Sequence, residues 1–142
     1  MADTKGNVKA LNKREFKERI FDYSFSKEWK YKGDQPAVID FYADWCKPCK
    51  VIAPIISELS SDYEGKVNFY KVNTEKEPQL SKIFGIANIP TLLLIPVEGQ
   101  PTMLKGVQPK FVLKRHIERM LPGSRKGFSL KKLFSSNNKN KD

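Results

Sequence analysis

Two cysteines separated by two residues, Cys46 and Cys49, are the residues of this chain whose type and spacing point most directly to chemistry. They are the only cysteines among 142 residues. A bond between them closes too small a loop to stabilise a fold, which excludes a disulfide framework of the kind found in small secreted proteins. Redox chemistry and metal binding remain as interpretations.

The sequence on either side predicts the elements that must position this pair. The run 37–42 has the β-branched and aromatic content of a buried strand, and apolar residues recur at helical spacing from Val51 to Leu59. The cysteines therefore lie at a strand-to-helix junction. A helix N-terminus carries unpaired N–H groups and partial positive charge, which favour a thiolate at Cys46 and make it a candidate nucleophile.

The run from Asp40 to Lys50, which includes Trp45 and the two cysteines, closely resembles the active-site segment of the thioredoxins. The resemblance continues through Pro54, Lys71, the segment 84–91 and Gly106, and covers about residues 36–121. It implies the α/β thioredoxin fold, a mixed central β-sheet with helices on both faces. The predicted order of elements agrees, since strands alternate with helices and two strands are adjacent.

For the cysteines, the resemblance implies a protein-disulfide reductase with a redox-active Cys46–Cys49 disulfide. Cys46 attacks a substrate disulfide, a mixed disulfide forms, and Cys49 resolves it by attacking Cys46. The spacing brings both sulfurs within bonding reach on the first helical turn, and we expect the first to be exposed and the second shielded. Lys47 and Pro48, between them, are expected to tune the pair.

Asp40 is an acidic residue in the middle of an apolar strand. Burial would raise its pKa towards neutrality, and its carboxylate could take the Cys49 proton through a water molecule. The matching thioredoxin position is credited with this role, and Lys71 matches the lysine beside it. The alternative is a partly solvated aspartate that faces a gap.

Ile89, Pro90 and Gly106 are implied to bind substrate. In thioredoxins the bond that matches Ile89–Pro90 is cis and lies against the cysteines, and the backbone of the preceding residue pairs with extended substrate. Trp45, Gly106 and the Ile89 segment would form a shallow apolar docking surface. Asn88 stands where many thioredoxins have glycine, which narrows that surface slightly.

Lys47 departs from the family, because most thioredoxins have glycine there. A cation beside Cys46 would stabilise its thiolate and make the pair more oxidising, or it would point into solvent with little effect. A dedicated oxidase or isomerase of the same fold therefore stays open as a function. A non-catalytic thioredoxin-fold binding module is the alternative from another class.

Two other interpretations of the cysteines stay open: inert buried thiols and a metal site. Structural zinc takes four Cys or His ligands, whereas this chain offers two cysteines and the single His116, so only a site shared between two chains would be complete. We expect no metal. His116 is expected to be a solvated or half-buried residue of the last helix.

Local signals set the remaining elements. A capping box of Asn12 and Glu15 begins the first helix, and the aromatic residues between 22 and 36 are expected to cover an edge of the fold. The last helix is expected to bury Leu113, Ile117, Met120 and Leu121. Helices are expected at about 13–21, from the cysteines to about 63, at 78–84 and at 109–121, and strands at 37–42, 67–72, 91–95 and 102–105.

The net charge of +10 is concentrated at the C-terminus, where residues 122–142 hold six Lys/Arg against one acidic residue. We therefore expect a thioredoxin domain over 1–123 and a basic, partly disordered tail over 124–142. A short amphipathic helix around Leu130, Leu133 and Phe134 could contact an anionic membrane or an acidic partner. Loose packing or disorder is the favoured alternative.

The remaining expectations concern partners and location. The nearly balanced charge of residues 36–121 gives little reason to propose nucleic-acid binding. The N-terminus lacks an apolar signal-peptide region, so we expect a cytoplasmic location. We also expect a monomer. The resemblance implies disulfide-containing protein substrates and a thioredoxin reductase that supplies electrons from NADPH. The chain itself has no nucleotide-binding fingerprint, and no bound cofactor is expected.

Overall fold

The computed structural model describes residues 6–122, which fall into two compact units, one ending at Lys110 and one beginning at Phe111. The first unit holds the whole sheet. The strands are β1 (Val8–Ala10), β2 (Ala37–Tyr42), β3 (Asn68–Asn73), β4 (Thr91–Ile95) and β5 (Thr102–Lys105). The helices are α1 (Lys13–Arg19), α2 (Lys47–Asp62), α3 (Pro78–Ile83) and α4 (Lys110–Met120).

The five strands form one mixed sheet in the order β1-β3-β2-β4-β5. β2 pairs with β3 in parallel and with β4 in antiparallel orientation, so the strand that precedes the cysteines lies at the centre. Its residues 37–41 are buried, as a central strand requires. Strand β1 was not predicted, because three residues are too few to show a periodic pattern.

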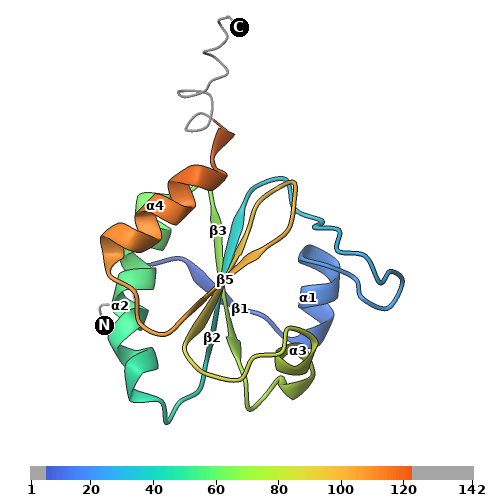
Figure 1. Cartoon of the computed structure of the whole chain (residues 1–142), viewed down its shortest axis with the longest axis horizontal. Helices are drawn as coiled ribbons and strands as arrows, with labels where there is room; N and C mark the ends of the chain where they lie inside the picture. Colours follow the sequence, from blue (N-terminus) through green and yellow to red (C-terminus); the bar gives the residue numbers. More distant parts are fainter. Residues whose placement is uncertain (1–5, 123–142) are drawn as a thin grey trace, which may run out of the picture. The chain divides into compact units, whose positions relative to one another are not determined.

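Within the first unit, helices cover both faces of the sheet. Helices α1 and α3 lie on one face and α2 lies on the other, as Figure 1 shows with the sheet seen edge-on. The predicted mixed sheet with helices on both faces is confirmed. The capping box is also present, because the Asn12 side chain accepts a hydrogen bond from the Glu15 N–H (2.8 Å) and the Glu15 carboxylate accepts one from the Asn12 N–H (3.0 Å).

The main core contains aromatic residues from α1, β2 and the segment between them. Tyr23, Trp29 and Tyr31 pack against this core, so the prediction that they cover an edge of the fold is confirmed for these three. It is wrong for Phe25, whose side chain is 89% exposed. A loop of polar and charged neighbours around Phe25 leaves that ring in solvent.

Helix α4 buries Leu113 and Ile117, as predicted. Met120 and Leu121 are only partly buried, so the prediction that they are buried is wrong; α4 ends at Met120. His116 is half-buried. The predicted amphipathic segment around Leu130 lies outside the described residues. Among residues 6–122, no helix combines the length and apolar character needed to cross a membrane.

Candidate redox site

Cys46 is the N-cap residue of α2, and this position determines the chemistry of its sulfur. Its backbone is extended (φ −87°, ψ 110°), and its Sγ accepts a hydrogen bond of 3.2 Å from the Cys49 N–H. The sulfur takes the place that a serine or aspartate oxygen occupies in an ordinary N-cap. Lys47 and Pro48 occupy the first helical turn, where the missing N–H of proline costs nothing.

A disulfide joins Cys46 to Cys49, with 5.3 Å between their Cα atoms. Both residues are only 3% exposed, so the prediction that the first is exposed and the second shielded is wrong for this disulfide state. The reason is packing, because Tyr42 and Ile89 lie against the cluster that the cysteines form with Ala43. The two sulfurs differ instead in their surroundings.

The segment that faces the Cys46 sulfur is the loop before β4. The Ile89–Pro90 peptide bond is cis, as the resemblance implies, and the Ile89 carbonyl oxygen lies 3.9 Å from Cys46 Sγ. The Gly106 N–H donates a hydrogen bond to the Pro90 carbonyl (2.8 Å). The Thr91 hydroxyl donates another to the Asn88 carbonyl (2.6 Å). These two bonds hold the loop against the disulfide.

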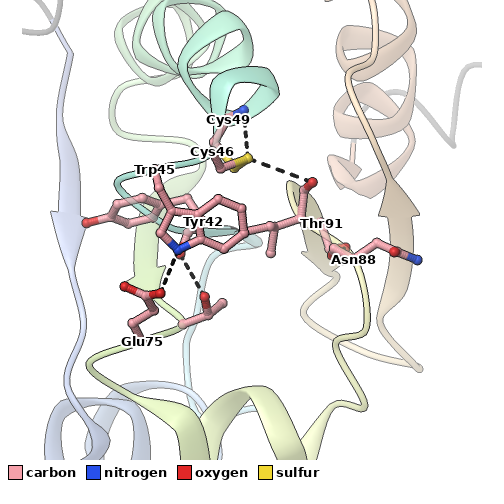
Figure 2. Close-up of a disulfide and its surroundings, with 9 residues drawn as sticks. Tyr42, Trp45, Cys46, Cys49, Glu75, Asn88 and Thr91 are labelled. Carbon is pink, nitrogen blue, oxygen red and sulfur yellow. Dashed lines mark hydrogen bonds between the residues drawn. A yellow bond between two sulfur atoms is a disulfide. The ribbon is translucent and has the colours of Figure 1, made fainter.

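Trp45 provides the exposed surface beside the disulfide. Its side chain is 65% exposed, and its indole Nε1–H donates a hydrogen bond of 2.5 Å to the Glu75 carboxylate, as Figure 2 shows. Sequence reasoning missed Glu75. The available signal was its position just after β3, because the carboxyl ends of parallel neighbours β2 and β3 meet at one edge of the sheet.

A groove of about 190 Å³ lies beside Cys49, and both Asp40 and Lys71 line it. Asp40 is 5% exposed, and its Oδ1 has no hydrogen-bond partner in the described part of the chain. Burial raises the pKa of Asp40 to about 7, while the positive charge of Lys71 opposes that rise. The predicted buried acid therefore lies in the same groove as the second cysteine.

Tyr42, which also lines this groove, is the second residue that sequence reasoning missed. The Lys71 Nζ lies 5.7 Å from the centroid of its ring. Lys47 is exposed at the first position of α2 and does not line this groove. Within residues 6–122, no group of three or more His, Cys, Asp and Glu side chains is arranged to hold a metal ion.

The fold and the cysteine pair together define a class of protein, the thiol–disulfide oxidoreductases, and comparison with known proteins identifies the family. The thioredoxin family model matches residues 7–119. The chain is 47% identical over 97 residues to a thioredoxin of Borreliella burgdorferi, covering 68% of this chain and 83% of that protein. It is 37% identical over 103 residues to thioredoxin 1 of Nostoc, covering 72% and 95%.

Solved structures agree with these sequence relatives. Thioredoxin of Malassezia sympodialis superimposes with a TM-score of 0.65 at 27% identity, covering 81% of this chain and 92% of that one. Chloroplastic thioredoxin z has a TM-score of 0.68 at 21% identity, covering 80% and 94%, and supports the fold. The chain belongs to the thioredoxin family. It is a protein-disulfide reductase with a C-x-x-C redox pair, and it acts in cell redox homeostasis.

Proposed function

We propose that Cys46 is the nucleophile of this reductase and that the N-cap geometry activates it. The observation that carries this proposal is the 3.2 Å hydrogen bond from the Cys49 N–H to Cys46 Sγ. A thiolate at this atom receives a charge-assisted hydrogen bond and the favourable end of the helix dipole. Cys46 thiolate attacks one sulfur of a substrate disulfide, and the other sulfur leaves as a thiolate.

Cys49 is the proposed resolving residue, with Asp40 as its proton acceptor. The Cys49 thiol gives its proton, through water in the groove, to the Asp40 carboxylate. Its sulfur then attacks Cys46 Sγ, the bond to substrate breaks, and the second substrate sulfur leaves with the electron pair. The substrate gains two electrons and the pair becomes a disulfide. Lys71 tunes Asp40 because its positive charge favours the carboxylate.

Trp45, Ile89, Pro90 and Gly106 are the proposed substrate-binding surface. The carbonyl oxygen of Ile89 lies 3.9 Å from Cys46 Sγ. An extended substrate whose backbone pairs with Ile89 would therefore bring its own cysteine within reach of Cys46. The exposed indole of Trp45 offers an apolar contact at the same site. Affinity would come mainly from backbone pairing, so that many substrate sequences are accepted.

Thioredoxin-family proteins act on protein substrates and are typically reduced by a thioredoxin reductase. We propose that the electrons come from NADPH through such a reductase, with no cofactor bound to this chain. A cytoplasmic location fits this cycle, because cytosolic reductants keep thiols reduced. The protein would act as a monomer without nucleic acid, and contact of the basic tail with a membrane is the less favoured alternative.

A thioredoxin domain over 1–123 followed by a basic tail over 124–142 also stays a proposal. It would be tested by comparing the full chain with a chain that ends at Pro122. We expect equal reductase activity and equal binding to anionic liposomes. Liposome binding by the full chain alone would show that the tail makes membrane contact.

The experiment that tests the site is insulin reduction with dithiothreitol or a thioredoxin reductase as electron donor. We expect catalysis by the wild-type chain and none by Cys46→Ser. Cys49→Ser is expected to trap mixed disulfides through Cys46. If Cys46→Ser keeps its activity while Cys49→Ser loses it without trapping substrate, the two assigned roles are wrong.

Lys47 is the one observation in favour of a dedicated oxidase or isomerase. Its ammonium group is carried by the residue that follows Cys46, at the first position of α2. The reduction potential distinguishes this second function. A value near that of the cytosolic reductants, about −270 mV, supports the reductase, and a value near −120 to −180 mV supports the oxidase or isomerase.

A further inference from the structure

Four polar residues share one face of the sheet where the groove opens. In the parallel register of β2 and β3, Asp40 lies opposite Lys71 and Tyr42 lies opposite Asn73. Residues two apart on a strand point to the same face, so all four side chains project towards the side that Asp40 occupies. Tyr42, Asp40 and Lys71 line the groove together with Cys49.

The Lys71 ammonium is located by the ring of Tyr42. Its Nζ lies 5.7 Å from the ring centroid, within the range of a cation–π contact. In the part of the chain that the structure describes, no carboxylate forms an ion pair with Lys71. A lysine has four rotatable side-chain bonds and would otherwise spread its charge over a wide volume. The Tyr42 ring confines that charge to the rim of the groove.

Tyr42 is itself held from two directions. It lies opposite Asn73 in the register of β2 and β3, and the Asn73 Oδ1 accepts the Glu75 and Lys76 N–H groups at 2.9 and 3.2 Å. Its carbonyl accepts hydrogen bonds from the Thr74 N–H (2.8 Å) and the Thr74 hydroxyl (3.1 Å). The ring also packs against the cluster of Ala43 and the cysteines. Its position is therefore fixed relative to both Cys49 and Asn73.

We infer that Tyr42 is a positioning residue for the proton-transfer step: its ring holds the Lys71 ammonium over the groove that leads to Asp40, and this sets the pH range in which Asp40 accepts the Cys49 proton. The inference rests on the role proposed above for Asp40. No bond changes at Tyr42; the proton passes from Cys49 Sγ to Asp40, and the electron pair left on Cys49 attacks Cys46 Sγ.

The charged groups around Asp40 determine in which direction its pKa shifts when Lys71 is released. Lys71 comes from β3, Lys50 from α2 and Asp44 from the loop between β2 and α2, and all three line the groove. The residue opposite Asp40 on β4 is Leu92, which is uncharged. Because Lys71 favours the carboxylate, releasing it from the groove rim raises the pKa of Asp40.

The test is a carbon-13 NMR titration of the Asp40 carboxyl group in the reduced full chain. Tyr42→Phe keeps the ring face and Tyr42→Leu removes it, while Lys71→Met removes the charge. We expect an upward pKa shift in Tyr42→Leu and in Lys71→Met, and none in Tyr42→Phe. Tyr42→Leu is expected to cause little further shift when Lys71→Met is already present, which separates the effect of Lys71 from a change in burial.

Two results overturn the inference. One is an Asp40 pKa that is unchanged in Tyr42→Leu. The other is an Asp40 pKa shift caused by Tyr42→Leu that is equally large in the wild-type and the Lys71→Met background. If Tyr42→Leu fails to fold, Tyr42→trifluorophenylalanine replaces it. Fluorination keeps the shape of the ring and weakens its negative face, so it should raise the Asp40 pKa relative to Tyr42→Phe. Equal pKa values in those two variants would also overturn it.

Insulin reduction as a function of pH separates this inference from the proposed role of Asp40. At pH 6 we expect Tyr42→Leu to be about two- to fivefold slower than Tyr42→Phe, the factor that corresponds to losing an exposed cation–π contact. An Asp40 titration that moves while the pH–rate profile stays fixed shows that Tyr42 places Lys71, but it contradicts the assignment of Asp40 as proton acceptor.

Discussion

The indole nitrogen of Trp45 donates a hydrogen bond of 2.5 Å to the Glu75 carboxylate. This contact links the residue before Cys46 to the loop after β3. Asn73 Oδ1 accepts the Glu75 N–H at 2.9 Å, so the loop that carries the carboxylate is itself ordered. The exposed indole, which belongs to the proposed docking surface, is thereby held in one orientation.

Removing this hydrogen bond should weaken substrate docking more than it slows the chemistry. For Glu75→Ala we expect KM for insulin to rise about fivefold with little change in kcat, as the loss of a hydrogen bond of about 1 kcal/mol implies. Steady-state kinetics measure both constants. Glu98→Ala, in the exposed turn at the far end of β4, is the control and should behave as wild type. A fall in kcat with KM unchanged would show that Glu75 acts on the reaction and not on docking.

Asp40 should make the oxidised protein less stable as pH rises. Its folded-state pKa of about 7 lies above its ordinary value of 3.8, so the folded protein binds more protons than the unfolded chain between these values. The free energy of unfolding therefore falls with pH across that window, by roughly 3 to 4 kcal/mol in total. Urea denaturation between pH 4 and 8 measures this slope.

Asp40→Asn should remove most of that slope, so that the variant is more stable than wild type at pH 8 and similar at pH 4. It should also reduce insulin more slowly. Asp44→Asn is the matched control, because it removes an exposed carboxylate from the same groove. An Asp40→Asn protein that is less stable at pH 8 would contradict burial as the cause of the raised pKa.

Much of the site could be predicted from local sequence. The bounds of β2 at 37–42 were correct, and so was the strand-to-helix junction at the cysteines, because a buried strand and a helical repeat of apolar residues meet there. The resemblance supplied Asp40, Lys71 and the cis Ile89–Pro90 bond, since these belong to a pattern shared along the chain.

Other features depend on contacts that local sequence does not encode. Tyr42 and Asn73 come together only through the register of β2 and β3, and Glu75 reaches Trp45 across 30 residues of sequence. The burial of Cys46 depends on the packing of Ile89, which lies 43 residues away. Strand pairing over such separations has no signature in a single sequence.

Gly106 should be required for docking because of its backbone conformation. Its φ is +83°, and a Cβ there would meet no atom within 4 Å, so Gly106→Ala costs about 1–2 kcal/mol of stability through strain alone. Relief of that strain would displace the N–H that holds Pro90, and we expect KM to rise. Gly99→Ala is a matched control, with φ of +99° in the turn at the far end of β4. It should lose similar stability with KM unchanged.

Lys47 should make the cysteine pair slightly more oxidising. Replacing its charge by Lys47→Gln is expected to raise the pKa of Cys46 and to lower the reduction potential by about 10 mV, as a surface interaction of about 0.5 kcal/mol implies. Equilibration with glutathione measures the potential. Lys82→Gln, on α3, is the control. Equal potentials for wild type and Lys47→Gln would mean that the charge of Lys47 has no effect on the cysteine pair.

The central claim is that the N-cap position makes Cys46 the activated thiolate. Its most direct test is alkylation of the reduced protein with limiting iodoacetamide across a pH series, with each cysteine followed by mass spectrometry. We predict that Cys46 is modified first, with a midpoint below the ordinary thiol pKa of about 8.5. Modification of Cys49 first, or of both cysteines with midpoints at 8.5 or above, would contradict the assignment.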